Sequence, residues 1–179
     1  RFATQDGRPA VVVGAVVRGE ADYLVEWLEY HRLLGVDGFV ILSNDCDDGG
    51  RTQQLLAPYV KAGVVLLGLD YWCVPRGTFE DRARAQLLSL ARNMSAWLLP
   101  LQVDEYAVVL DHAASLPGAL ASYPGFDALA LPVRLFGASG YRTRPQGSAL
   151  ANYVLHSSAR VPKARAQVVP ALRASECER

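Results

Sequence analysis

Two adjacent acids, Asp104 and Glu105, directly follow a mainly apolar run over residues 96–103. A continuous apolar run predicts a strand that is buried on both faces of a sheet. In open α/β sheets, ligands bind in the crevice beyond the carboxyl ends of the strands. Carboxylates at that position can hold a divalent cation, and the cation can hold a phosphate. The alternative is a polar turn after a strand, and this stretch alone does not decide between the two.

A second group of acids follows another apolar segment, residues 38–42. Its polar members are Asn44, Asp45, Asp47 and Asp48. Such residues form turns and cap helices, which is the structural alternative to a binding role. The loop lacks the terminal glutamate of an EF-hand, and the chain has none of the glycine-rich phosphate loops. The remaining design is a set of acids at several strand ends that holds a metal, with the metal holding a diphosphate.

The pattern of apolar residues predicts alternating strands and helices. We expect strands over 10–17, 38–42 and 64–67, and helices over 22–34 and 52–61, with Asp22 as the N-cap of the first helix. This alternation is typical of right-handed βαβ units with a parallel sheet. Further elements are a helix that begins near Thr78, a strand over 107–110, a helix over 116–122 and a strand over 128–133. The tail from Pro170 has no periodicity, and His31, on an apolar helix face, is better read as a core histidine than as a ligand.

Composition bounds the class of protein. The 179 residues, of which 51% are hydrophobic, are enough for one domain over residues 1–179, with truncation at the C-terminus left open. The net charge of zero gives no field that would attract nucleic acid. Three cysteines far apart predict neither a disulfide framework nor a zinc site. No apolar run reaches the ~18 residues of a transmembrane segment, so we expect a cytoplasmic location, with peripheral attachment to the inner membrane left open.

Several blocks, in order, resemble glycosyltransferases of the family 2-like and family 92-like branches. The blocks are Arg18–Leu24, Glu26–His31 with Gly35 and Val36, Ser43–Gly49, Gln86, Trp97–Tyr106 and Arg134–Gly140. They extend from about Val11 to Gly140, and agreement of several ordered blocks is more specific than any single one.

The resemblance implies a GT-A-like, Rossmann-like α/β fold with a mostly parallel sheet flanked by helices. It further implies a nucleoside diphosphate sugar donor (UDP- or GDP-sugar), Mn²⁺ or Mg²⁺, and a glycan or lipid-linked acceptor. The residues that it assigns to the nucleotide are Arg18, Glu20, Asn44, Asp45, Asp47 and Gln102. It assigns the metal to Asp104, which with Glu105 makes up the expected catalytic pair.

The chain departs from the family pattern at three positions. Gln102 replaces the first Asp of Asp-x-Asp, Gly19 replaces an Asn, and Val133 replaces a Trp. An inverting transfer needs a base for the acceptor hydroxyl. Glu105 and His156 are the candidates, although a surface or packing role suits His156 better. Glu105 is adjacent to Asp104, and neighbouring side chains on a strand face opposite ways.

Two functions from different classes follow. The first is an enzyme that transfers a sugar, which the Asp104–Glu105 pair and the acidic loop favour. The second is a non-catalytic nucleotide- or glycan-binding module of the same fold, which Gln102 and the short C-terminal part favour. A nucleotidyltransferase on a similar sheet fits the acids but not the ordered blocks.

Overall fold

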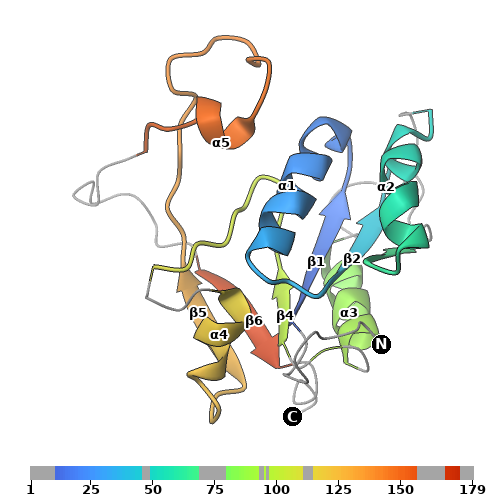
Figure 1. Ribbon diagram of the computed structural model, residues 1–179, viewed down its shortest axis with the longest axis vertical. Coiled ribbons are helices and arrows are strands. Elements are labelled where there is room, and N and C mark those ends of the chain that lie inside the picture. Colours follow the sequence, from blue (N-terminus) through green and yellow to red (C-terminus); the bar gives the residue numbers. More distant parts are fainter. Residues whose placement is uncertain are drawn as a thin grey trace.

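The computed structural model describes residues 11–45, 49–68, 80–92, 95, 97–110, 115–156 and 168–173. Within these ranges, six strands form one sheet in the order β3-β2-β1-β4-β6-β5 (Figure 1). The strands are β1 (Val11–Val17), β2 (Gly38–Ser43), β3 (Val65–Gly68), β4 (Trp97–Pro100), β5 (Ala128–Pro132) and β6 (Val168–Arg173). The first four in the sheet are parallel, and β6 runs antiparallel to both β4 and β5.

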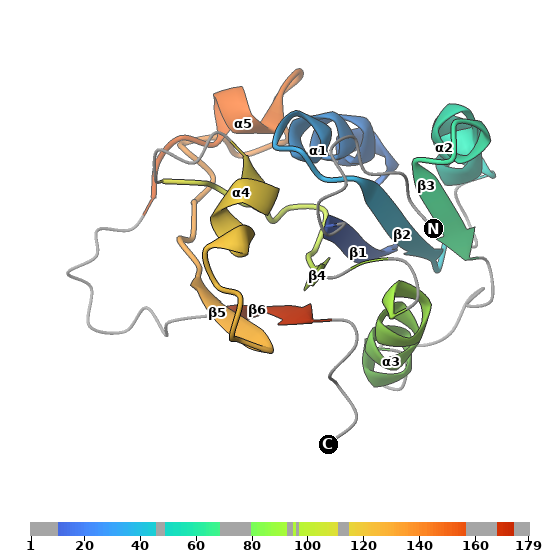
Figure 2. The ribbon, with the colours of Figure 1, turned by 60° about the horizontal axis from the view of Figure 1, so that its bottom comes forward.

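Helices cover both faces of the parallel strands. The helices are α1 (Ala21–Leu33), α2 (Arg51–Lys61), α3 (Glu80–Ala91), α4 (Leu116–Ala121) and α5 (Ala149–Asn152). Figure 2 shows α1 and α2 on one side of β1 and β2, and α3 on the other. A parallel sheet covered on both faces has the Rossmann-like arrangement. The predicted α/β sheet flanked by helices is therefore confirmed.

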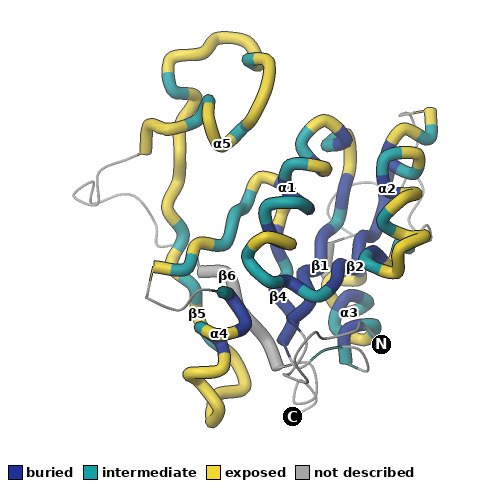
Figure 3. The backbone as a smooth tube through the Cα atoms, in the orientation of Figure 1, coloured by how far each residue is buried: buried dark blue, intermediate teal, exposed yellow. Residues whose placement is uncertain are grey.

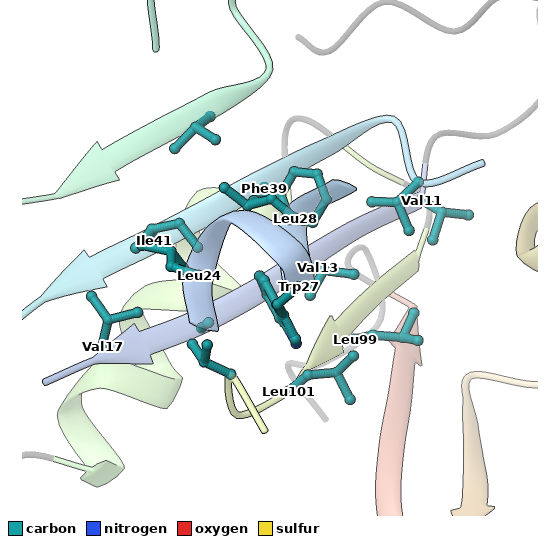
Figure 4. Packing of buried hydrophobic residues seen from close by; sticks show 14 of the residues in the cluster. Val11, Val13, Val17, Leu24, Trp27, Leu28, Phe39, Ile41, Leu99 and Leu101 are labelled. Atoms are coloured by element: carbon teal, nitrogen blue, oxygen red, sulfur yellow. The ribbon is translucent and has the colours of Figure 1, made fainter. Parts of the chain in front are cut away.

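Two apolar clusters hold these layers together. On the α1 face, Trp27 and Leu28 pack with Val13, Phe39 and Leu99 (Figure 4). On the α3 face, a smaller cluster contains Val12, Val40, Ala83, Leu87, Ala91 and Leu98. Because alternate residues of β1 enter opposite clusters, every residue of the strand except the half-buried Val16 is buried, as the mainly dark colour in Figure 3 shows. The continuous apolar run of the sequence thus follows from burial on both faces.

Gly14 lets α3 approach β1 closely. A Cβ atom at this position would lie 3.1 Å from Cδ2 of Leu87 and 3.2 Å from Cδ1 of Leu98. A larger residue would force these leucines to move, and well-packed cores resist such insertions.

Two predicted details near the N-terminus and the centre of the chain are wrong. Helix α1 begins at Ala21 with Glu20 as its N-cap, so Asp22 lies in the first turn instead of capping the helix. The predicted strand over residues 107–110 is not a strand, because its backbone groups at Ala107 bind side chains of α1.

The described part of the tail, residues 170–173, is also different from the expectation, since it belongs to β6. Proline lacks the N–H that a ladder needs and argues against an inner strand. In the structure, β6 pairs with β4 only through Leu172 and Arg173, so Pro170 lies beyond that ladder and pairs with Ala130 of β5 alone. Thr78, near which the sequence predicts the start of a helix, lies outside the described residues, and the described part of that helix is α3.

None of the helices in the described ranges has the length and apolar character that crossing a bilayer would require.

His31 is the core histidine that the helix pattern suggested. It is 0% exposed, and the Ala107 N–H donates to its Nε2 over 3.2 Å. The proton must therefore be on Nδ1, which lies 2.8 Å from the carbonyl oxygen of Trp27 and donates to it. Burial lowers the pKa of His31 from 6.5 to about 4. Both ring nitrogens are satisfied only in the neutral form.

We expect His31 to make folding stability depend on pH. The unfolded chain binds a proton at this position below pH 6.5, whereas the folded chain does so only below about 4. Stability should therefore fall as the pH is lowered through this window, by about 2 kcal/mol between about pH 7.5 and pH 5. Urea unfolding of the unmodified chain and of His31→Gln at both pH values measures the contribution of His31 to this loss of stability. His156→Gln, at an exposed histidine, is the matched control, and equal pH slopes for His31→Gln and the unmodified chain would contradict the assignment.

Candidate active site

The carboxyl ends of β1, β2 and β4 meet at one edge of the sheet. Val17 pairs with Ser43, Gly14 pairs with Pro100, and the Leu101 N–H donates to the Gly14 carbonyl oxygen over 2.9 Å. The chain passes from β1 through β2 to β3 in one direction, and β4 lies on the other side of β1. The strand order therefore reverses between the neighbouring strands β1 and β4. Open α/β sheets bind ligands beyond the carboxyl ends of the strands at such a point. The arrowheads of β1 and β2 in Figure 1 point to this edge.

Asp45 joins the segment after β1 to the first turn of α2. Its side chain is 7% exposed, and its Oδ1 accepts a hydrogen bond from the Gly19 N–H. Its Oδ2 accepts the hydroxyl hydrogen of Thr52 over 2.7 Å. Gly19 has a φ of +73°, which glycine adopts without the penalty that a Cβ brings. Both carboxylate oxygens of Asp45 therefore have partners inside the protein.

The other predicted site residues of the loops after β1 and β2 lie beside Asp45. Asn44 is buried, and its N–H donates to the Val17 carbonyl oxygen over 2.9 Å. Arg18 is exposed, whereas Glu20 is half-buried and accepts a bond from the Arg18 N–H over 3.4 Å. Asp47 lies outside the described residues. The structure thus brings Arg18, Glu20, Asn44 and Asp45 together, as the ends of neighbouring parallel strands require.

A tight turn over residues 102–105 follows β4. The Glu105 N–H donates to the Gln102 carbonyl oxygen over 3.0 Å, and the Gln102 N–H donates to Oε2 of Glu105 over 2.8 Å. Burial raises the pKa of Glu105, and the Asp104 charge raises it further, although the bond from Gln102 and the Arg84 charge oppose this. Gln102 and Asp104 are exposed. Glu105 is therefore engaged in its own turn, and Asp104 is the carboxylate of this turn that faces solvent.

Helix α1 fixes the position of this turn. The Trp27 indole N–H donates to the Glu105 carbonyl oxygen over 2.8 Å. The Tyr30 hydroxyl donates to the Ala107 carbonyl oxygen over 2.7 Å, and His31 accepts the N–H of the same residue. The Tyr106 ring packs edge-on against Tyr30, with 5.1 Å between centroids. The carbonyl oxygen of Glu105 and both polar backbone groups of Ala107 thus have hydrogen-bond partners on α1.

The described side chains of this site could bind a metal ion only together with a bound ligand. The described residues contain no group of three side chains that could hold a metal ion by themselves. Mg²⁺, however, commonly binds to one or two carboxylates together with substrate phosphates and water. Asp104 suits this mode, because it is an exposed carboxylate at the switch point. A cation here would be held jointly with a phosphate-bearing ligand.

A second set of charged contacts, which the sequence did not predict, lies along the N-terminal half of α1. Asp22 pairs with Arg51 of α2 and with Arg144, whose guanidinium lies 4.0 Å from the centre of the Tyr23 ring. Hydrogen bonds from Arg51 and then Arg144 lower the pKa of Asp22. Residues 22 and 144 are 122 positions apart, so no local periodicity reveals the pair.

Glu26 extends this contact to α5. It accepts bonds from the Ser148 hydroxyl and from the N–H groups of Ala149 (2.7 Å) and Leu150 (3.3 Å). Burial raises the pKa of Glu26, but these three hydrogen bonds together bring it below its usual value. The carboxylate thus satisfies the free N–H groups at the start of α5.

His156, the weaker candidate for a base, packs against Phe136 with 5.4 Å between ring centroids. The two residues form an isolated antiparallel bridge, and His156 is exposed. This is the packing role that its sequence context favoured.

No protein-family model and no curated protein matches the sequence. Among solved structures, the crystal structure of 4-diphosphocytidyl-2C-methyl-D-erythritol synthase matches with a TM-score of 0.43 and 14% identity, over 94% of this chain and 76% of that chain. We draw nothing about activity from a similarity of this size, so the glycosyltransferase resemblance depends on the ordered blocks of residues alone.

We expect Asp45→Ala to destabilise the fold by about 2–4 kcal/mol, because it leaves the Gly19 N–H and the buried Thr52 hydroxyl without their acceptor. Asp45→Asn should cost roughly 1 kcal/mol or less, since its amide oxygen can accept from Gly19 and its NH₂ can donate to the rotated hydroxyl of Thr52. Urea unfolding of both variants measures the difference. Equal losses for Ala and Asn would show that the two hydrogen bonds do not account for the effect.

Proposed function

We propose that this chain is a metal-dependent glycosyltransferase of GT-A-like fold, which moves a sugar from a nucleoside diphosphate sugar to a glycan or lipid-linked acceptor. One observation carries the proposal. Blocks that resemble this class of enzyme occur at residues 18–20, 43–45 and 102–106, far apart in the sequence. They follow β1, β2 and β4, whose carboxyl ends meet where strand order reverses. The loops after parallel strands always share this edge, so the support comes from the resemblance of three such loops, at the strands that flank the switch point, to one class of enzyme.

The residues then divide by position. Arg18, Asn44 and Asp45, at the ends of β1 and β2, form the proposed nucleoside side of the site, with Asp47 in the same loop. Glu20 supports this side through its bond with the Arg18 backbone. Gln102 offers an exposed amide to hydroxyl groups of the donor, and Asp104 offers the metal carboxylate. Mn²⁺ or Mg²⁺, when bound, would neutralise charge on the departing diphosphate.

Glu105 is the proposed base for the acceptor hydroxyl. Burial raises the pKa of its carboxyl group, which makes the carboxylate a better proton acceptor near neutral pH. The Gln102 N–H occupies only Oε2 of Glu105, so the acceptor hydroxyl could donate to Oε1. The turn over residues 102–105 could therefore keep this hydrogen bond when the acceptor binds.

The alternative is a non-catalytic module that binds a nucleotide or glycan at the same edge. The engagement of Glu105 in its own turn and the neutral Gln102 favour it. Both functions predict nucleotide binding, so donor turnover is the property that separates them. Release of diphosphate from a nucleoside triphosphate would instead indicate a nucleotidyltransferase.

We expect Mn²⁺ to tighten the binding of UDP or GDP, and Asp104→Ala to abolish this gain. A carboxylate at the switch point can share the cation with the diphosphate. Calorimetry with each nucleotide, with Mn²⁺ and with chelator, measures the difference. Asp127→Ala is the matched control, because Asp127 is an exposed aspartate just before β5, at the opposite edge of the sheet. Equal affinity in chelator would contradict the metal site.

We expect Gln102→Asp to tighten Mn²⁺-dependent nucleotide binding and to raise or create donor turnover. A carboxylate about 4 Å from a dication gains about 8 kcal/mol of gross Coulomb energy at an effective dielectric near 20. Desolvation cancels much of this, so the net gain should be a few kcal/mol at most, on the order of 2. Calorimetry and a sugar-release assay on both forms measure the two effects. If neither affinity nor turnover changes, Gln102 does not lie at the donor site.

A further inference from the structure

Residues 133–156, which we call the distal segment, form a surface with an unusual composition. The chain contains no Asp or Glu from residue 128 to residue 175. The distal segment itself carries Arg134, Arg142 and Arg144. It leaves β5, rises along the molecule and returns to α1 through α5 (Figure 1). The tube in Figure 3 is mostly yellow there, which means that most of its residues are exposed.

The distal segment exposes several large apolar side chains. Six of them have exposed fractions between 43% and 63%: Leu135, Phe136, Tyr141, Leu150, Val154 and Leu155. The two ends of the segment lie side by side, because Phe136 bridges to His156 and the Gly137 N–H donates to the Leu155 carbonyl oxygen over 2.8 Å. Several large exposed apolar side chains within one segment indicate an interaction surface.

This surface is fixed to the body of the protein. Asp22 holds Arg144, and Glu26 holds the start of α5. Arg144 is therefore neutralised locally, whereas Arg134 and Arg142 are exposed and form no ion pair with any described residue. The distal segment thus presents apolar side chains and two uncompensated positive charges on an anchored support.

We propose that the distal segment docks on the surface of an anionic lipid bilayer. Apolar side chains of a peripheral surface enter the boundary between headgroups and acyl chains, and arginines bind the anionic headgroups. An acid-free stretch suits an anionic partner, since no carboxylate repels it. Nucleic acid is the less suitable anion, because uncompensated arginines are outnumbered by exposed apolar groups that a phosphate backbone would not cover.

Membrane docking would also orient the molecule. The distal segment contacts the N-terminal half of α1, and this half follows directly from the loop at the end of β1. A bilayer beneath the distal segment would bring a lipid-linked acceptor near that edge. This orientation depends on the proposed glycosyltransferase function, whereas vesicle binding itself does not.

Sedimentation of the chain with vesicles tests the proposal, with phosphatidylglycerol-containing vesicles compared with pure phosphatidylcholine. We expect binding to the anionic vesicles that weakens as salt is raised. Leu135→Ser combined with Leu155→Ser should lower the partition coefficient about tenfold. Arg142→Gln should lower it about fivefold for anionic vesicles and leave neutral ones unaffected. Leu33→Ser, at a leucine that is 87% exposed at the other end of α1, should change nothing.

Several results would overturn the proposal. These are no binding to anionic vesicles, an equal loss for Leu33→Ser, or tighter binding to single-stranded RNA than to vesicles. A dimer in light scattering that the leucine double variant dissociates would assign the surface to a second copy of the chain. Circular dichroism and thermal unfolding of each variant verify the fold. The UDP and GDP titrations, performed without vesicles, test the proposed function separately.

Discussion

The proposed active-site turn depends on three side chains of α1 that replace a missing strand partner. Beyond Leu101 the chain no longer pairs with β1, and a backbone polar group without a partner costs about 1–3 kcal/mol when buried. Trp27 and Tyr30 donate to carbonyl oxygens of this segment, and His31 accepts an N–H. Since Trp27 also packs against Phe39 of the sheet within the main apolar core, the position of the Asp104 turn is coupled to that core.

Because side chains take the place of a strand partner here, some elements could be predicted from the sequence and others could not. The parallel sheet was predictable, because strands buried on both faces leave continuous apolar runs such as Val11–Val17. Residues 107–110 have the same local composition as a strand, but the backbone groups of Ala107 find their partners on a helix some 76 positions earlier. In β6 the local sequence misleads in the opposite direction. Pro170 argues against an inner strand, but the ladder between β6 and β4 is short and does not include Pro170.

The candidate site shows the same division. Its location was predictable, since parallel strands bring Asp45 and Asp104 to one edge whatever the loops do. The direction of each carboxylate was not, because it is set by donors elsewhere: Gly19 and Thr52 for Asp45, and the Gln102 N–H for Glu105. The family resemblance assigned Asp45 to the nucleotide, yet the structure also gives this carboxylate a structural role. The nucleotide role of Asp45 therefore needs its own support from binding measurements.

Helix α1 serves two regions through different kinds of hydrogen bond, which gives them different responses to acid. Its C-terminal half holds the turn after β4 with neutral groups, among them His31, whose contribution declines as the pH falls from 6.5 toward about 4. Its N-terminal half holds the distal segment through Glu26, whose pKa lies below the ordinary 4.5. The stability contributed by that carboxylate is fully present above 4.5 and is lost only below it. Acidification therefore weakens the support of the proposed active site before it weakens the attachment of the distal segment.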